Sequence, residues 1–187
     1  MEEDIRNYLL PGEQLVWWGA PKRGVMLTSR DLFLVPFSLL WGGFAIFWEA
    51  NALRMHAPIF FPVFGALFVA VGLFFIFGRF IFDAWLRGGT VYGVTSRRVL
   101  IARKGPYPNF VAVSLGQLPP ASLSEGANGR GTIRFGEAMR FAWPYGMRGG
   151  MSYWTPSLDP TPQFIGIEDA RRVFNQIQSA THRGVQA

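Results

Sequence analysis

Two kinds of side chain that often carry enzyme chemistry are absent or scarce in this sequence. It contains no cysteine and only two histidines, His56 and His182. The lack of cysteine excludes a disulfide framework, thiolate metal sites and cysteine nucleophiles. The histidines are expected in a connecting loop and in the C-terminal tail, so they cannot share a metal or acid–base centre. The sequence therefore predicts no active site built on histidine or cysteine.

Motifs for phosphate binding, nucleophilic catalysis and secretion are also incomplete. Gly126, Gly129 and Gly131 form G-x-x-G-x-G, but a predicted strand follows them, without the helix and lysine of a P-loop. A hairpin turn is the simpler explanation. Ser152 lacks the spacing of a nucleophile elbow. The acidic N-terminus predicts no signal peptide, since no apolar run occurs before Leu32. We predict no catalytic residues, no cofactor and no bound metal.

The most informative feature is a long apolar run from Ala57 to Gly78. It has no formal charge, and fourteen of its residues are Phe, Leu, Ile or Val. As a helix it would be roughly 33 Å long, about the thickness of the hydrocarbon core of a bilayer. An apolar surface on every side is rare in soluble helices. This run is therefore predicted to be a transmembrane helix.

A second uncharged run, Leu32 to Trp48, predicts another membrane helix and hence a hairpin over residues 31–80. Small residues at three- and four-residue spacing are expected to let the two helices approach closely. These are Ser38, Gly42 and Ala45 on the first helix, and Ala66 and Ala70, with Gly65 and Gly72 nearby, on the second. The alternative is that glycine and alanine are simply common in membrane helices.

Basic residues predict the orientation of the hairpin. Lys22, Arg23 and Arg30 precede it and several arginines follow it, whereas the connecting loop has only Arg54. The positive-inside rule then places both termini in the cytoplasm. From Arg79 onward thirteen Lys or Arg face six Asp or Glu, which favours contact with anionic lipid over nucleic acid, because no nucleic-acid motif accompanies the charge.

Three charged residues follow the second run at four-residue spacing, Arg79, Asp83 and Arg87. They share one face if the helix continues, so the carboxylate can pair with either arginine. An ion pair inside the membrane would suggest transport or sensing. Because the residues lie after the apolar run, we instead expect the side chains to extend to the lipid headgroups.

The remainder of the chain has the composition of short strands. Runs rich in β-branched and aromatic residues predict strands at 14–19, 90–94, 98–104, 110–115, 122–125, 132–135 and 141–143. Residues 145–162 are rich in Gly, Pro and aromatics and predict a long irregular loop. An amphipathic pattern near Ile167 to Ala180 predicts a closing helix, with Glu168 and Asp169 in its first turn.

Several short motifs resemble bacterial pleckstrin-homology (PH) membrane proteins. Tyr92 to Ile101 (YGVTSRRVLI) resembles the Y-x-[VL]-T-x-x-R-[VL] hairpin of that family, and Gly129 to Gly136 resembles its G-T-I-x-F strand. Phe164 to Ala170 resembles the segment that leads into its last helix. Pro11-Gly12-Glu13, followed by Trp17 and Gly19, is similar to its P-G-E…W-x-G start.

The resemblance implies an α+β membrane protein. Residues 1–30 would form a cytoplasmic segment whose strand joins a PH-like antiparallel β-domain at 81–187, with a C-terminal helix capping that domain. The hairpin at 31–80 would separate the two parts in the sequence. The expected location is the bacterial cytoplasmic (inner) membrane.

The function that these observations favour is a non-catalytic binding or scaffold module that binds a partner protein or assembles into a homo-oligomer. The alternative is a sensor of anionic headgroups, and a component of a membrane enzyme or transporter is a remote third. The headgroup contacts would be six basic residues expected at the membrane-facing end of the domain: Lys22, Arg23, Arg97, Arg98, Arg103 and Lys104.

Overall fold

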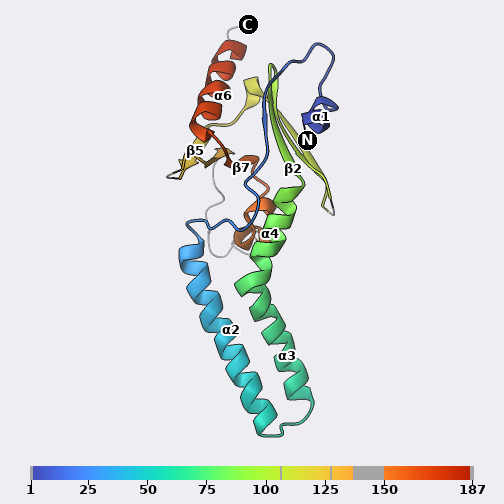
Figure 1. Cartoon of the computed structure of the whole chain (residues 1–187), viewed down its shortest axis with the longest axis vertical. Helices are drawn as coiled ribbons and strands as arrows, with labels where there is room; N and C mark the ends of the chain where they lie inside the picture. The colour runs from blue at the N-terminus through green and yellow to red at the C-terminus, as the bar shows by residue number, and fades with distance from the viewer. Residues whose placement is uncertain (1, 106, 127, 137–149, 186–187) are drawn as a thin grey trace. The chain divides into compact units, whose positions relative to one another are not determined.

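The structure, a computed structural model, describes residues 2–105, 107–126, 128–136 and 150–185. The chain is α+β and forms two compact units (Figure 1). Val25–Ala84 makes up the hairpin unit, and Met1–Gly24 together with Trp85–Ala187 makes up the β unit. The β unit has two pieces because a strand before the hairpin pairs with a strand after it.

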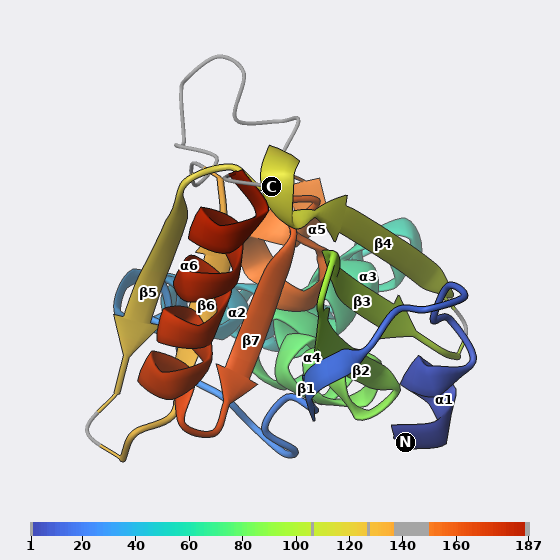
Figure 2. The same cartoon turned by 90° about the horizontal axis from the view of Figure 1, so that it is seen from above.

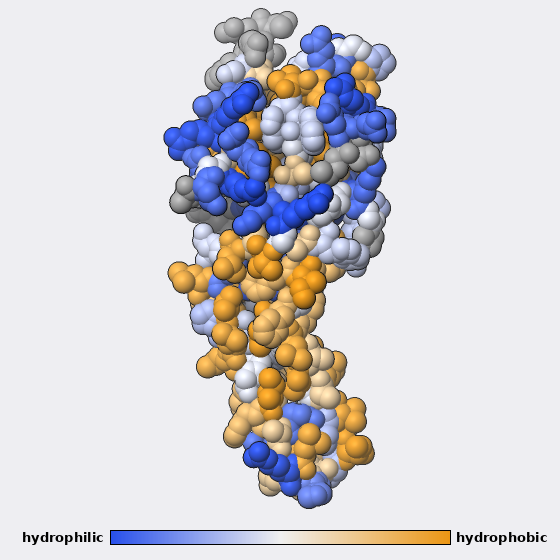
Figure 3. Space-filling model, in the orientation of Figure 1, coloured by the Kyte–Doolittle hydropathy of each residue, from blue (hydrophilic) through white to orange (hydrophobic). Residues whose placement is uncertain are grey.

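The hairpin unit holds helices long and apolar enough to cross a membrane. Helix α2 (Asp31–Arg54) has 24 residues. The other helix runs over 29 residues from Phe60 to Gly88 and consists of α3 (Phe60–Leu73), a π-helical turn η1 (Phe74–Gly78) and α4 (Arg79–Gly88). Apolar side chains cover most of the outer surface of α2 and α3 (Figure 3).

The helix limits differ from the predicted runs at the connecting loop. Helix α2 continues past Trp48 to Arg54, because the intervening residues are mostly good helix formers. The second helix begins at Phe60 and not at Ala57. Pro58 disfavours a helical conformation at Ala57, and the N–H of Phe61 closes a turn on the carbonyl of Pro58 at 2.9 Å.

Glycines bring α2 and α3 into contact. Ser38, Gly42 and Ala45 are buried on α2, as the spacing predicted. A Cβ atom on Gly72 would lie 3.0 Å from the Cα of Gly42, so the two backbones meet at this point. On α3 the buried small residues are Gly65 and Gly72.

The predicted contact row of Ala66 and Ala70 was wrong, since both alanines are exposed. Gly65 and Gly72 lie seven residues apart, two helical turns, and therefore occupy the face that meets α2.

The β unit contains two antiparallel sheets. One has the order β1-β2-β3-β4 and the other the order β5-β6-β7. The strands are β1 (Leu15–Gly19), β2 (Thr90–Thr95), β3 (Arg98–Arg103), β4 (Asn109–Ser114), β5 (Ala121–Glu125), β6 (Gly131–Phe135) and β7 (Gln163–Ile167). Helix α6 (Ala170–Val185) packs against the three-stranded sheet (Figure 2). A short helix, α1 (Glu2–Arg6), places Ile5 over the other face of β2 and β3.

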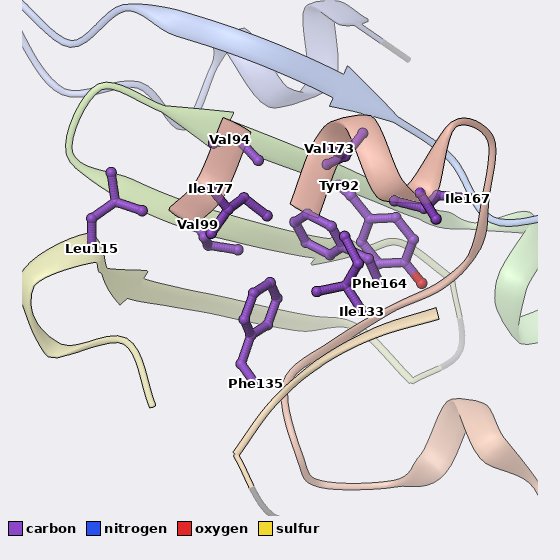
Figure 4. Packing of buried hydrophobic residues seen from close by; sticks show 11 residues of the cluster. Tyr92, Val94, Val99, Leu115, Ile133, Phe135, Phe164, Ile167, Val173 and Ile177 are labelled. Carbon is purple, nitrogen blue, oxygen red and sulfur yellow. The ribbon is translucent and has the colours of Figure 1, made fainter. Parts of the chain in front are cut away.

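The core of the β unit lies between the two sheets and α6. The rings of Tyr92 and Phe164 stack with centroids 4.6 Å apart, and Trp17 stacks on Phe164 at 5.6 Å. Val173 and Ile177 of α6 point into the same cluster (Figure 4). One side of α6 is thereby buried, which leaves its polar side exposed.

The C-terminal region differs from the prediction. Ile167 ends strand β7, and α6 begins at Ala170, so Glu168 and Asp169 form a turn before the helix. Asp169 has a positive φ of 49°, and this sharp turn reverses the chain between strand and helix. The predicted loop at 145–162 includes helix α5 (Gly150–Trp154) and a 3-10 turn, Pro156–Leu158. The predicted strand at 141–143 lies outside the described residues.

Candidate functional site

The turn before β1 is held by a buried ion pair. The guanidinium of Arg98 donates to the carboxylate of Glu13 from Nε at 2.9 Å and from Nη2 at 2.9 Å. The hydroxyl of Thr95 and the N–H of Leu10 also donate to this carboxylate, at 2.7 and 2.8 Å. Burial alone would raise the pKa of Glu13, but these hydrogen bonds and the charge of Arg98 outweigh burial and lower the pKa to about 2.

The segment after β1 is held by a second buried arginine. Arg87 in α4 donates to the carbonyls of Lys22 and Gly24, the latter at 2.8 Å. The N–H of Lys22 donates to the carbonyl of Gly166 in β7 at 3.1 Å. The chain after Gly19 therefore runs beside β7 and reaches the edge of the second sheet.

Strand β1 is an edge strand. Within the described residues it pairs with β2 on one side and with no strand on the other, from Leu15 opposite Thr95 to Gly19 opposite Tyr92. An irregularity in the register between Leu15 and Trp17 marks a β-bulge, and a bulge changes the direction of the side chain within it. Here Trp17 enters the core, whereas Val16 stays exposed beside α6.

A groove runs between β1 and the exposed side of α6. It consists of two cavities of about 1180 and 670 Å³, both lined by Asp169 and Arg172. The larger cavity lies along Val16 and the α6 residues Asn175 and Ser179. The smaller cavity continues along the chain after β1, past Trp18, Lys22 and Arg23. We call the two cavities together the β1–α6 groove.

Cations are in excess at the end of the groove that follows β1. Two arginines of the groove are already paired: Arg130 with Glu168 at this end, and Arg171 with Glu125 in the larger cavity at 2.7 Å. The side chains of Lys22, Arg23 and Arg172 line the smaller cavity and have no ion pair within the described part of the chain. These three cations outnumber Asp169, so this end attracts negative charge.

The structure does not bring the six predicted basic residues together. Arg98 and Arg103 are the two ends of strand β3, which places them about 17 Å apart. Arg98 is committed to Glu13, and Arg103 donates to the carbonyls of Tyr107 and Ser157, both at 2.8 Å. Arg97 is exposed at the β2–β3 turn, and Lys104 follows the other end of β3.

Of the six predicted basic residues, Lys22 and Arg23 line the groove and the other four do not. The third cation beside them is Arg172 of α6, which the sequence did not predict as a site residue. Its signal was available in the polar side of the predicted closing helix.

Arginines expected to extend to the lipid headgroups are instead buried. Arg79 is 2% exposed and its guanidinium contacts the carboxylate of Asp31 at 2.7 Å, while its Nε donates to the carbonyl of Phe75 at 2.9 Å. A π-helical turn interrupts the regular hydrogen-bond pattern of an α-helix. The carbonyl of Phe75, which accepts from Arg79, lies in this turn. Arg87 is also 2% exposed and Asp83 is 4% exposed. The expectation for these residues was wrong, because each arginine finds oxygen acceptors inside its own unit.

Comparison with protein-family models, with curated proteins and with solved structures finds no match to this chain. Across the described ranges, no group of three His, Asp or Glu side chains is arranged to hold a metal ion. What the groove offers is a free strand edge, a polar helix side and a cationic end. These features suit the binding of a ligand.

Proposed function

We propose that this protein is a membrane-anchored binding module with a PH-like fold, located on the cytoplasmic side of a bacterial inner membrane and acting without catalysis. It binds a partner protein or a second copy of itself. The fold supports this proposal in its order of elements: a four-stranded and a three-stranded antiparallel sheet followed by one C-terminal helix. That order agrees with the resemblance of its hairpin and strand motifs to PH-like membrane proteins.

The pairing of β1 with β2 supports a common side for both ends of the hairpin. Gly19 lies opposite Tyr92, and the whole hairpin unit is inserted between them. A sheet cannot form through a bilayer, so the two flanks share one compartment if α2 and the second helix cross the membrane. The excess of Lys and Arg in these flanks favours the cytoplasm.

The observation that carries the binding role is the β1–α6 groove. Free strand edges and polar helix sides are surfaces on which proteins bind other chains. All residues that line the groove belong to the β unit. They supply hydrogen-bonding groups along one side of the groove and three cations at one end.

Site-specific photo-crosslinking in native membranes tests the role. A photoreactive amino acid replaces Val16, which is 53% exposed in the groove, or Tyr107, which is 54% exposed outside it. The proposal expects a protein adduct at position 16 and a weaker one or none at position 107. Failure to obtain any protein adduct at position 16, together with a monomeric mass in micelles, would contradict it.

A second candidate function is recognition of anionic headgroups. Lys22 and Arg23 favour it, because both lie in the segment that leads to the hairpin and neither has an ion pair within the described residues. Native mass spectrometry of the full chain released from mixed phosphatidylcholine and phosphatidylglycerol nanodiscs tests it. Replacing both residues by glutamine should reduce the number of retained phosphatidylglycerol molecules, and equal retention would exclude this function.

A further inference from the structure

We infer that the β1–α6 groove binds an extended, acidic segment of a partner polypeptide, with its acidic side chains at Lys22, Arg23 and Arg172. The inference rests on the proposed function and names the site and the chemistry of the partner. The inference requires that the two cavities adjoin, that their walls carry hydrogen-bonding groups for an extended backbone, and that cations lie at one end of the groove.

The two cavities of the groove adjoin. Asp169 and Arg172 line both of them, so the cavities share an edge at these residues. Along α6, the lining extends from Arg172 to Ser179, a rise of about 10 Å. A single headgroup phosphate would occupy only the cationic end. An extended chain of several residues would fill the length.

The walls offer partners for a backbone. Among the strands that the structure describes, β1 has a neighbour, β2, on one side only, and alternate residues of an edge strand point their N–H and C=O groups away from the sheet. Directly after β1, the backbone N–H of Lys22 points away from the sheet in this way and donates to the carbonyl of Gly166 in β7. On the opposite wall, the polar side chains of Asn175, Gln176 and Ser179 of α6 line the larger cavity.

The charge selects acidic side chains at one end. Glu125 and Glu168 are neutralised by Arg171 and Arg130. Lys22, Arg23 and Arg172 are left to oppose Asp169 alone among the charged groups of the smaller cavity. The larger cavity continues past neutral Val16, Asn175 and Ser179. The groove therefore fits a segment that is acidic near one end and uncharged along the remainder.

The experiment measures retention of random peptide pools on the full-length chain in nanodiscs of neutral phosphatidylcholine. Three pools of equal length carry several Asp or Glu, several Lys or Arg, or only uncharged residues. The acidic pool should be retained about tenfold more than the basic pool, and high salt should reduce the difference. Equal retention of the three pools would overturn the inference.

Two variants test whether the acidic peptides bind in the groove. Arg172→Glu reverses a cation that has no ion pair among the described residues, and Asn175→Trp fills the larger cavity from an exposed helix position. Each should reduce retention of the acidic pool about tenfold. The matched control is Arg97→Glu, which makes the same charge change at an exposed residue outside the groove lining and should leave retention unchanged. All variants must keep the thermal stability of the parent chain.

Two further results separate this inference from the proposed function. A protein adduct at position 16 that persists while Arg172→Glu and Asn175→Trp leave peptide retention unchanged would refute the acidic segment but keep a binding module. A phosphatidylglycerol adduct at position 16 in anionic nanodiscs, in place of a peptide adduct, would assign the groove to lipid and overturn the inference.

Discussion

Removal of the charge on Glu13 should weaken the β unit by about 3 kcal/mol at neutral pH. The pKa of Glu13 falls from 4.5 to about 2 in the folded chain, and each pKa unit corresponds to about 1.4 kcal/mol of preference for the ionised state. The substitution Glu13→Gln keeps the size of the side chain but loses the ion pair with Arg98. It also leaves the partly buried Arg98 with less compensation for its charge.

The pH dependence of this stability has a definite sign. Because the folded pKa is lower than the unfolded value, the unfolded chain takes up the proton first as the pH falls. The contribution of Glu13 is therefore complete above the unfolded value of 4.5 and is lost progressively as the pH falls through the folded value of about 2. The window of loss lies between these two values.

Hydrogen–deuterium exchange of the full chain in micelles measures the effect locally. Amides of β2 and β3 report the opening free energy of the sheet that Glu13 and Arg98 join. The control is Glu3→Gln, an exposed glutamate near the same end of the chain. If Glu13→Gln leaves exchange in β2 and β3 unchanged at neutral pH, or if the variant keeps the acid dependence of the parent chain, the reasoning fails.

Three other predictions concern the hairpin unit. Gly72→Leu should lower the free energy of unfolding in micelles by about 1–3 kcal/mol, because the larger side chain overpacks the helix contact. The control Gly43→Leu should leave this free energy unchanged, because a Cβ added at Gly43 meets open space. Asp31→Asn should lower the free energy of unfolding by about 3–5 kcal/mol, because it removes a carboxylate that contacts the buried guanidinium of Arg79, and Arg79→Gln in the same chain should recover part of that loss. A single cysteine at Met55 should react with membrane-impermeant maleimide added outside intact cells.

Each of these predictions has a contradicting result. Equal thermal stability of the two glycine variants would show that the helices do not meet at Gly72. A double variant as unstable as Asp31→Asn alone would deny the coupling of the pair. A cysteine at Arg97 serves as the topology control, because it should react only after the membrane is opened. Labelling of that position from outside would reverse the proposed orientation.

The sequence by itself determined the features that depend on local pattern. The apolar runs predicted two long helices, and runs rich in β-branched and aromatic residues predicted six of the seven strands within the described residues. Strand β7 (Gln163–Ile167) was missed because it lies between the predicted loop and the predicted closing helix, and Ile167 also fits the apolar face of that helix. The turn at Glu168 and Asp169, where Asp169 has a positive φ, delays the start of α6 to Ala170.

The tertiary structure alone decided which distant residues meet. Arg98 was expected at a membrane surface, but it binds Glu13, which lies 85 positions away. Arg79 finds Asp31 on the other helix of the hairpin. The groove exists because β1 joins a sheet formed after the hairpin, which places Lys22 and Arg23 beside Arg172. Hydropathy and propensity describe neighbours along the chain, whereas ion pairs and grooves arise from strand register and helix packing between remote segments.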